Sequence, residues 1–152
     1  MRVNNDPSGI RRGFTLPEML IVIVVSVLVV AMATPASARQ LRRGRVNQAA
    51  SIVAADLENA VSLSARSRKP VRITRATATS FTVADRSTGA VILRRELGSN
   101  TEWKVASLTF SNATVDVFPA GTTSGALTVT LTEGGYSRQV RLTRAGLTQV
   151  IQ

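Results

Sequence analysis

The side chains that most often carry catalysis or bind metal ions are missing from this sequence. Its 152 residues include no His and no Cys. This excludes imidazole-based catalytic pairs, thiol nucleophiles, and zinc, haem or iron–sulfur sites that depend on those ligands. The remaining acids and hydroxyls show no spacing typical of a paired-carboxylate or serine-based active site. We therefore expect a protein that is not an enzyme and that holds no cofactor and no metal.

Arginine is the residue type that could still do chemistry here, because it binds anions. Lys and Arg number 19 against 9 Asp and Glu, for a formal net charge of +10, and 17 of the 19 are Arg. The guanidinium group pairs bidentately with phosphate oxygens, so DNA is one candidate partner. The alternative is an Arg-rich surface that is only solvated or that faces acidic lipid.

One group of arginines near the C-terminus is the best candidate for a DNA- or anion-binding site. Arg138, Arg141 and Arg144 recur at intervals of three residues in and after a predicted strand. On an ideal strand Arg138 and Arg144 share a face and Arg141 points to the other, so a continuous patch requires a bulge or a turn. DNA binding is therefore the second hypothesis for this chain.

Residues 19–38 form an uncharged, largely apolar segment. Twenty helical residues are long enough to cross the roughly 30 Å hydrocarbon core of a bilayer. The segment could be a membrane helix, a cleavable secretory signal or a buried core helix. A secretory signal is supported by Arg11 and Arg12 ahead of the segment and by a small-x-small cleavage site at 36–38.

Two features favour a helix that stays on the mature chain. Glu18 heads the apolar segment, and a carboxylate that enters hydrocarbon costs about 2.5 to 3.5 kcal/mol unless a partner neutralises it. An amphipathic pattern also continues past the secretory cleavage site, through Leu41, Val46, Ala49, Val53, Leu57, Ala60 and Ser64. We therefore expect one long helix that ends near Arg68, just before Pro70.

The rest of the chain alternates with period two, which is typical of strands. Candidate strands are 71–75, 81–84, 91–95, 105–110, 114–118, 127–132, 136–143 and 147–151. The predicted fold class is α+β, with a long N-terminal helix, first transmembrane and then amphipathic, packed on a small antiparallel β-sheet domain. Trp103 and Tyr136 are expected in the core of that domain, and the alternative is an exposed contact pair.

Residues 11–18, Arg-Arg-Gly-Phe-Thr-Leu-Pro-Glu, resemble the class III leader of type IV pilins and pseudopilins when the apolar segment follows them. In that family a membrane peptidase cuts after the glycine and methylates the new N-terminal phenylalanine. The resemblance implies cleavage between Gly13 and Phe14 and N-methylation of Phe14. Glu18 then becomes the fifth mature residue and Pro35 the twenty-second, positions where such pilins carry Glu and a helix-kinking Pro.

The resemblance also implies an assembly role, partners and a location. Glu18 would neutralise the N-terminal ammonium of a neighbouring subunit, whereas the alternative is a side chain that snorkels to water. The partners would be other pilins, the prepilin peptidase and the inner membrane, crossed once with the C-terminal domain outside. The implied parts are a cleaved leader at 1–13, a transmembrane and assembly helix at 14–38, an amphipathic helix half at 39–69 and a β domain at 70–152.

Four arginines follow the apolar segment directly, and we call them the collar: Arg39, Arg42, Arg43 and Arg45. With basic residues on both sides of the segment, the positive-inside rule does not set its orientation. The orientation implied by the family places the collar at lipid headgroups of the outer leaflet. The alternative is a solvated helix face.

Three downstream segments, 63–67, 117–121 and 138–146, resemble the GspH and FimT group of minor pseudopilins. Members of this group are low-abundance subunits near the tip of a type II secretion pseudopilus or a type IV pilus, and some bind DNA during uptake. DNA-binding members carry further arginines after the terminal glycine, whereas here Gly146 is followed by Leu-Thr-Gln. We therefore expect a structural minor subunit for filament assembly and protein secretion, with DNA uptake in transformation as the alternative.

Overall fold

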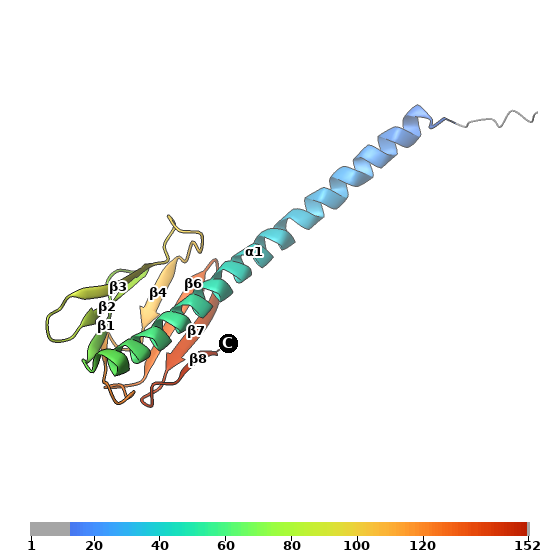
Figure 1. The fold of residues 1–152 in the computed structure, drawn as a ribbon. Coiled ribbons are helices and arrows are strands. Elements are labelled where there is room, and N and C mark those ends of the chain that lie inside the picture. Colours follow the sequence, from blue (N-terminus) through green and yellow to red (C-terminus); the bar gives the residue numbers. More distant parts are fainter. Residues whose placement is uncertain (1–12, 152) are drawn as a thin grey trace, which may run out of the picture. The chain divides into compact units, whose positions relative to one another are not determined.

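The computed structural model describes residues 13–151, and of residues 33–36 it describes the backbone alone. One helix, α1, spans Leu16–Ser67, and the strands follow it (Figure 1). The chain divides into two compact units, one that ends at Ala38 and one that begins at Arg39. The strands are β1 Val71–Arg75, β2 Ser80–Asp85, β3 Val91–Glu96, β4 Ser107–Phe110, β5 Thr114–Val117, β6 Leu127–Glu133, β7 Tyr136–Leu142 and β8 Thr148–Ile151.

The first half of α1 exposes its apolar side chains as far as Met32. Every large apolar residue from Met19 to Met32 is at least half exposed. Within residues 13–151, α1 is the one helix long and apolar enough to cross a membrane. Soluble monomers rarely expose so continuous an apolar surface, so we expect lipid or neighbouring subunits to cover it.

The second half of α1 is amphipathic and packs on the sheets. Its buried side chains recur mostly every three or four residues, as one buried helix face requires, and they include Val46, Ala49, Ala50, Val53, Leu57, Ala60 and Ser64. Leu41, which the sequence pattern placed in this stripe, is 63% exposed. That part of the prediction is wrong, because the core that the stripe joins begins at Val46.

The helix ends at Ser67, one residue before the predicted end. Arg68 follows with a φ of 54°, the left-handed conformation that closes many helices. The buried hydroxyl of Ser64 lies 2.9 Å from the carbonyl oxygen of Lys69 and 3.1 Å from that of Val117. This hydroxyl therefore ties the end of α1 to strand β5.

The strands form two antiparallel four-stranded sheets, ordered β3-β2-β1-β5 and β4-β6-β7-β8. Each predicted strand is present, with ends within two residues of the predicted ones. The sequence pattern predicted one sheet, however. The division arises because β5 pairs with β1, far away in the sequence, and not with β4, which directly precedes it.

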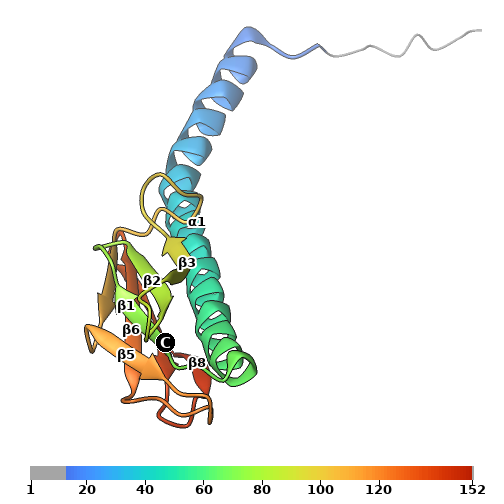
Figure 2. The same ribbon diagram turned by 60° about the vertical axis from the view of Figure 1, so that its left-hand side comes forward.

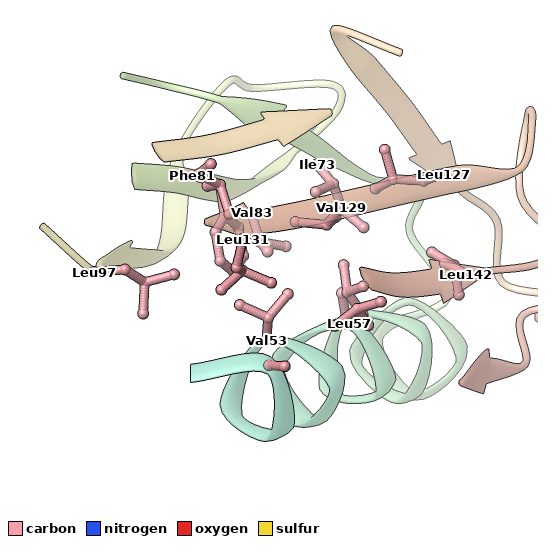
Figure 3. Packing of buried hydrophobic residues seen from close by; sticks show 14 of the residues in the cluster. Val53, Leu57, Ile73, Phe81, Val83, Leu97, Leu127, Val129, Leu131 and Leu142 are labelled. Carbon is pink, nitrogen blue, oxygen red and sulfur yellow. The ribbon is translucent and has the colours of Figure 1, made fainter. Parts of the chain in front are cut away.

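A single core joins the second half of α1 to both sheets, which lie along it (Figures 1 and 2). Val53 and Leu57 point from α1 toward the sheets, where Leu131 of β6 faces them (Figure 3). All the apolar residues that are buried in the described part of the chain belong to this one cluster. Trp103 and Tyr136 are half-buried and pack against this cluster, so they lie at the edge of the core and not within it.

Two of the segments that carry the family resemblance meet at a pair of glycines. Gly146, in the turn between β7 and β8, has a φ of 74°, and a Cβ built on it would lie 2.1 Å from the carbonyl oxygen of Gly121. Thr123, two residues beyond Gly121, donates its backbone N–H to the carbonyl of Arg144 at 3.0 Å. Gly146 is thus required both by its backbone conformation and by close contact with another backbone.

We predict that Gly146→Ala destabilises the sheet domain far more than Gly89→Ala does. Gly89 has nearly the same φ, 72°, but a Cβ there would meet nothing within 4 Å. Left-handed strain alone costs about 1 kcal/mol, whereas the added backbone clash raises the cost at Gly146 to roughly 3 kcal/mol or more. Denaturant unfolding of the full chain in detergent, followed by Trp103 fluorescence, measures both costs. Equal costs would contradict the close approach of Gly146 to Gly121.

Candidate processing and assembly site

The bond between Gly13 and Phe14 lies outside regular secondary structure, just before α1 begins at Leu16. Phe14 is 74% exposed, and a Cβ at Gly13 would meet nothing within 4 Å. Arg11 and Arg12, the basic residues of the predicted leader, lie outside the described residues. The chain at this bond is therefore exposed.

Glu18 sits at the third position of α1 and caps the helix N-terminus. The backbone N–H of Thr15 donates to Glu18 Oε2 at 3.4 Å, while the carbonyl of Thr15 accepts the N–H of Met19 at 3.2 Å. This is the glutamate half of a capping box, in which Thr15 is the N-cap and the carboxylate lies near the positive end of the helix dipole. The Thr-x-x-Glu spacing of residues 15–18 is the known sequence signal of this motif, and it was not among the predicted features.

Pro17 and Pro35 both lie within α1. Pro17 is the second residue of the helix, where a missing N–H breaks no interior hydrogen bond. Pro35 belongs to the residues of which the backbone alone is described. A kink at Pro35 therefore remains a prediction.

The three arginines of the predicted anion cluster do not share one surface. Arg138 and Arg141 lie on opposite faces of β7, since they are an odd number of residues apart in one strand. Arg144 lies beyond the strand, in the β7–β8 turn. Arg141 and Arg144 are exposed, whereas Arg138 is half-buried. No bulge is recorded in β7 that would bring Arg141 to the other face.

Arg138 is instead tied to α1 through Asn47. Its Nε donates to Asn47 Oδ1 at 2.7 Å, and the hydroxyl of Tyr136 donates to the same oxygen at 3.1 Å. The guanidinium of Arg43 lies over the Tyr136 ring, 5.7 Å from its centroid. The β6–β7 hairpin therefore meets the start of the second half of α1 through a connected polar network, which sequence spacing could not reveal because its members are about 90 residues apart.

Carboxylates neutralise several other arginines. Asp116 contacts Arg72 at 2.7 Å and Arg86 at 3.0 Å, and its hydrogen bond to Arg72 holds the pKa of the Asp116 carboxyl below its usual value. Asp56, buried on α1, binds the two sides of the Arg95 fork at 2.6 and 2.8 Å. That hydrogen-bonded pairing raises the pKa of Arg95. The ion pair between Asp56 and Arg95 connects edge strand β3 to α1.

Asp85 closes the turn between β2 and β3. Its Oδ1 accepts the hydroxyl of Ser87 and the backbone N–H groups of Ser87 and Thr88, the latter two at 2.7 and 3.1 Å. These bonds stabilise the carboxylate, and the Ser87 hydroxyl contributes most to lowering the pKa of Asp85 to about 2. The charged form of Asp85 is therefore part of the folded turn.

Two family profiles match the sequence. The prokaryotic N-terminal methylation motif matches residues 10–34, and the profile described as type II transport protein GspH matches residues 49–146. Among curated proteins, none matches the sequence significantly. The two profile matches confirm the resemblance predicted from the leader and from the downstream segments.

The fold is similar to that of the type IV minor pilin FimU of Pseudomonas aeruginosa strain PAO1. Against its crystal structure in space group P21, the TM-score is 0.60 at 16% identity, over 72% of this chain and 90% of that one. Against the P65 form it is 0.57 at 15% identity, over 70% and 92%. At this identity the likeness concerns the fold alone, and it confirms the predicted pilin-like class.

We predict that the free energy of unfolding falls as the pH is lowered from about 4 to about 2. The pKa of Asp85 is about 2 in the folded chain, below its ordinary 3.8, and that of Asp116 is also lowered. Their stabilisation is therefore complete above about pH 4 and is lost as the pH falls through the folded pKa values. Urea titrations of the full chain in detergent, at a series of pH values, measure this loss.

The control for that measurement is the double variant Asp85→Asn and Asp116→Asn. Neither amide ionises, so the loss between pH 4 and pH 2 should shrink. An unchanged slope would assign the acid sensitivity to other carboxylates.

Proposed function

Because the chain belongs to the GspH family of type II transport proteins, we propose that it is a minor subunit of a type II secretion pseudopilus or of a type IV pilus. The single observation that carries the proposal is the joint occurrence of a methylation motif at 10–34 and the GspH profile at 49–146 in one chain. The pilin-like fold is consistent with it. Such a subunit acts by assembly, so its residues need geometry rather than catalytic chemistry.

We propose that the mature chain begins at Phe14. Residues 1–13 are then a leader, 14–38 cross the inner membrane once and later enter the filament, 39–69 form the amphipathic half of the helix, and 70–152 form the β domain outside the membrane. The exposed apolar side chains from Met19 to Met32 support this division, since they need a nonaqueous cover before and after assembly. The open backbone at Gly13 supports cleavage there.

In this proposal Glu18 sets the register of assembly. Cleavage creates an ammonium group on Phe14, and a carboxylate buried among apolar helices needs such a partner in a neighbouring subunit. The capping bond from Thr15 holds the Glu18 side chain at the helix N-terminus, close in sequence to the new ammonium. The same bond gives Glu18 a partner within its own chain until a neighbour arrives.

A DNA-binding minor pilin for uptake is the second candidate. Its support is the formal net charge of +8 that remains when residues 1–13, with three Arg and one Asp, are removed from the chain. Arg141 and Arg144 are also exposed, and they form no ion pair with any residue in 13–151. Against it, Arg138 is occupied by Asn47, and Arg141 lies on the other face of β7. The structural role in a filament is therefore the proposal that we favour.

We predict that the protein isolated from native membranes begins with N-methylated Phe14. Intact-mass measurement and N-terminal sequencing test this directly. A bulky residue in place of Gly13, as in Gly13→Trp, should leave the leader uncut, because the leaders that this segment resembles are cut after a glycine. An N-terminus at Arg39 would instead identify an ordinary secreted domain, and the filament proposal would fail.

We predict that Glu18→Gln is cut and methylated like the parent chain but enters filaments at a greatly reduced level, by about tenfold or more. The amide keeps a hydrogen-bond acceptor for Thr15 but cannot neutralise an ammonium group, whose unpaired burial costs several kcal/mol. Quantifying the subunit in sheared filaments and in membranes measures the ratio. Glu58→Gln, an exposed change further along α1, is the control, and equal incorporation of both variants would refute the role of Glu18.

A further inference from the structure

A hollow of about 120 Å³ lies where the collar meets the β6–β7 hairpin, lined by Arg39, Arg42, Arg43, Gly134, Gly135 and Tyr136. We propose that this hollow binds the phosphate of an anionic phospholipid headgroup at the outer surface of the inner membrane. The inference that the phosphate belongs to a membrane lipid rests on the proposed function, in which residues 14–38 cross the inner membrane. The volume holds several water molecules and hence one phosphate group.

The helix itself concentrates positive charge at this point. Arg39, Arg42 and Arg43 are spaced three and four residues apart, so their side chains share one face of α1. Arg42 and Arg43 form no ion pair with any carboxylate among residues 13–151. Like charges at these spacings repel one another, and a bound anion removes that repulsion.

The guanidinium of Arg43 is held in place without using up its donors. It lies over the Tyr136 ring at 5.7 Å, and the Tyr136 hydroxyl is fixed to Asn47, one turn further along α1. A cation–π contact leaves the five N–H donors of Arg43 free for oxygen atoms. Arg138 shares Asn47 Oδ1 and so steadies the same network.

The hairpin turn forms the opposite wall and leaves room for Arg42. Gly134 and Gly135 have φ values of 53° and 81°, as a two-residue hairpin turn requires. A Cβ on Gly134 would lie 2.9 Å from Cδ of Arg42 and 3.0 Å from its Nε. The absence of a side chain at Gly134 therefore lets Arg42 lie across the turn.

The position of the hollow in the sequence favours lipid over other phosphates. Arg39 directly follows the uncharged segment 19–38, so a chain that crosses the bilayer brings the collar to the headgroups. Each basic side chain near an anionic surface contributes attraction that adds to that of its neighbours. Glu133, which directly precedes the turn, forms no ion pair with Arg42 or Arg43 among the described residues.

Binding of short-chain lipid to the full chain in a non-ionic detergent tests the proposal. Native mass spectrometry counts bound dioctanoyl phosphatidylglycerol, with dioctanoyl phosphatidylcholine, inorganic phosphate and a DNA duplex as separate competitors. We expect one phosphatidylglycerol per chain, and a Kd raised about tenfold or more by Arg42→Gln with Arg43→Gln. Arg94→Gln with Arg141→Gln removes the same charge from exposed positions elsewhere and should change the Kd less than about twofold.

Two single variants keep the test decisive if the double variant does not fold. Arg43→Gln changes an exposed side chain and should raise the Kd about threefold or more. Glu133→Gln removes the neighbouring negative charge and should lower the Kd. Melting curves by circular dichroism check that each variant is folded.

Three results would overturn the proposal. Equal weakening by the two double variants would assign binding to net charge alone. Displacement of the lipid by inorganic phosphate at equal concentration would make the hollow a phosphate site with no membrane source, and stronger displacement by duplex DNA would assign the arginines to nucleic acid. The lipid-binding assay requires neither leader cleavage nor filament assembly. A chain that binds no lipid can therefore still carry a methylated Phe14, and an unmethylated chain can still bind lipid.

Discussion

The packing of one helix stripe against two sheets is the interaction on which the folded unit depends. The sheets have separate strand orders, and the core side chains of both belong to one cluster with the stripe of α1. Val53 and Leu57 supply the bulk at its centre, while Ala49, Ala50 and Ala60 are small enough for close approach of the backbones. Buried polar groups then fix the direction of packing, since Asp56 binds Arg95 of β3 and Ser64 reaches the carbonyl of Val117.

Helix α1 has an exposed apolar first half and a second half that packs on the sheet domain. The side-chain types change between these two halves. From Met19 to Met32 the apolar residues are exposed on all sides of the helix, which suits lipid or a bundle of identical helices. From Arg39 the chain is charged, and from Val46 one face is buried in its own sheet domain. Residues 39–45 follow the exposed apolar segment and precede the first core residue, Val46. Because none of them belongs to the core, Leu41 is exposed and the four arginines of the collar are tolerated there.

Much of the fold follows from local patterns. Helix and strand positions were predictable because the apolar period changes from 3.6 to 2 after Pro70. The pairing of β5 with β1 was not, because it depends on contacts between distant segments. The candidate site likewise has one part that local sequence predicts and another that depends on contacts between distant segments. Gly13, Phe14 and Glu18 occupy the spacing of a known leader, whereas the bond from Arg138 to Asn47 depends on tertiary packing between residues far apart in the sequence.

A lipid-binding collar would act against the assembly role proposed for Glu18. A subunit that enters a filament leaves the bilayer, so each arginine bound to a headgroup opposes extraction by about 1 kcal/mol. Pairing of Glu18 with a neighbouring ammonium, together with burial of the apolar half of α1 among other helices, must exceed that cost. The collar would then hold an unassembled subunit at a fixed depth, with its N-terminus presented to the growing end. Headgroup contacts would be released only when neighbouring subunits replace them, so extraction would be coupled to assembly.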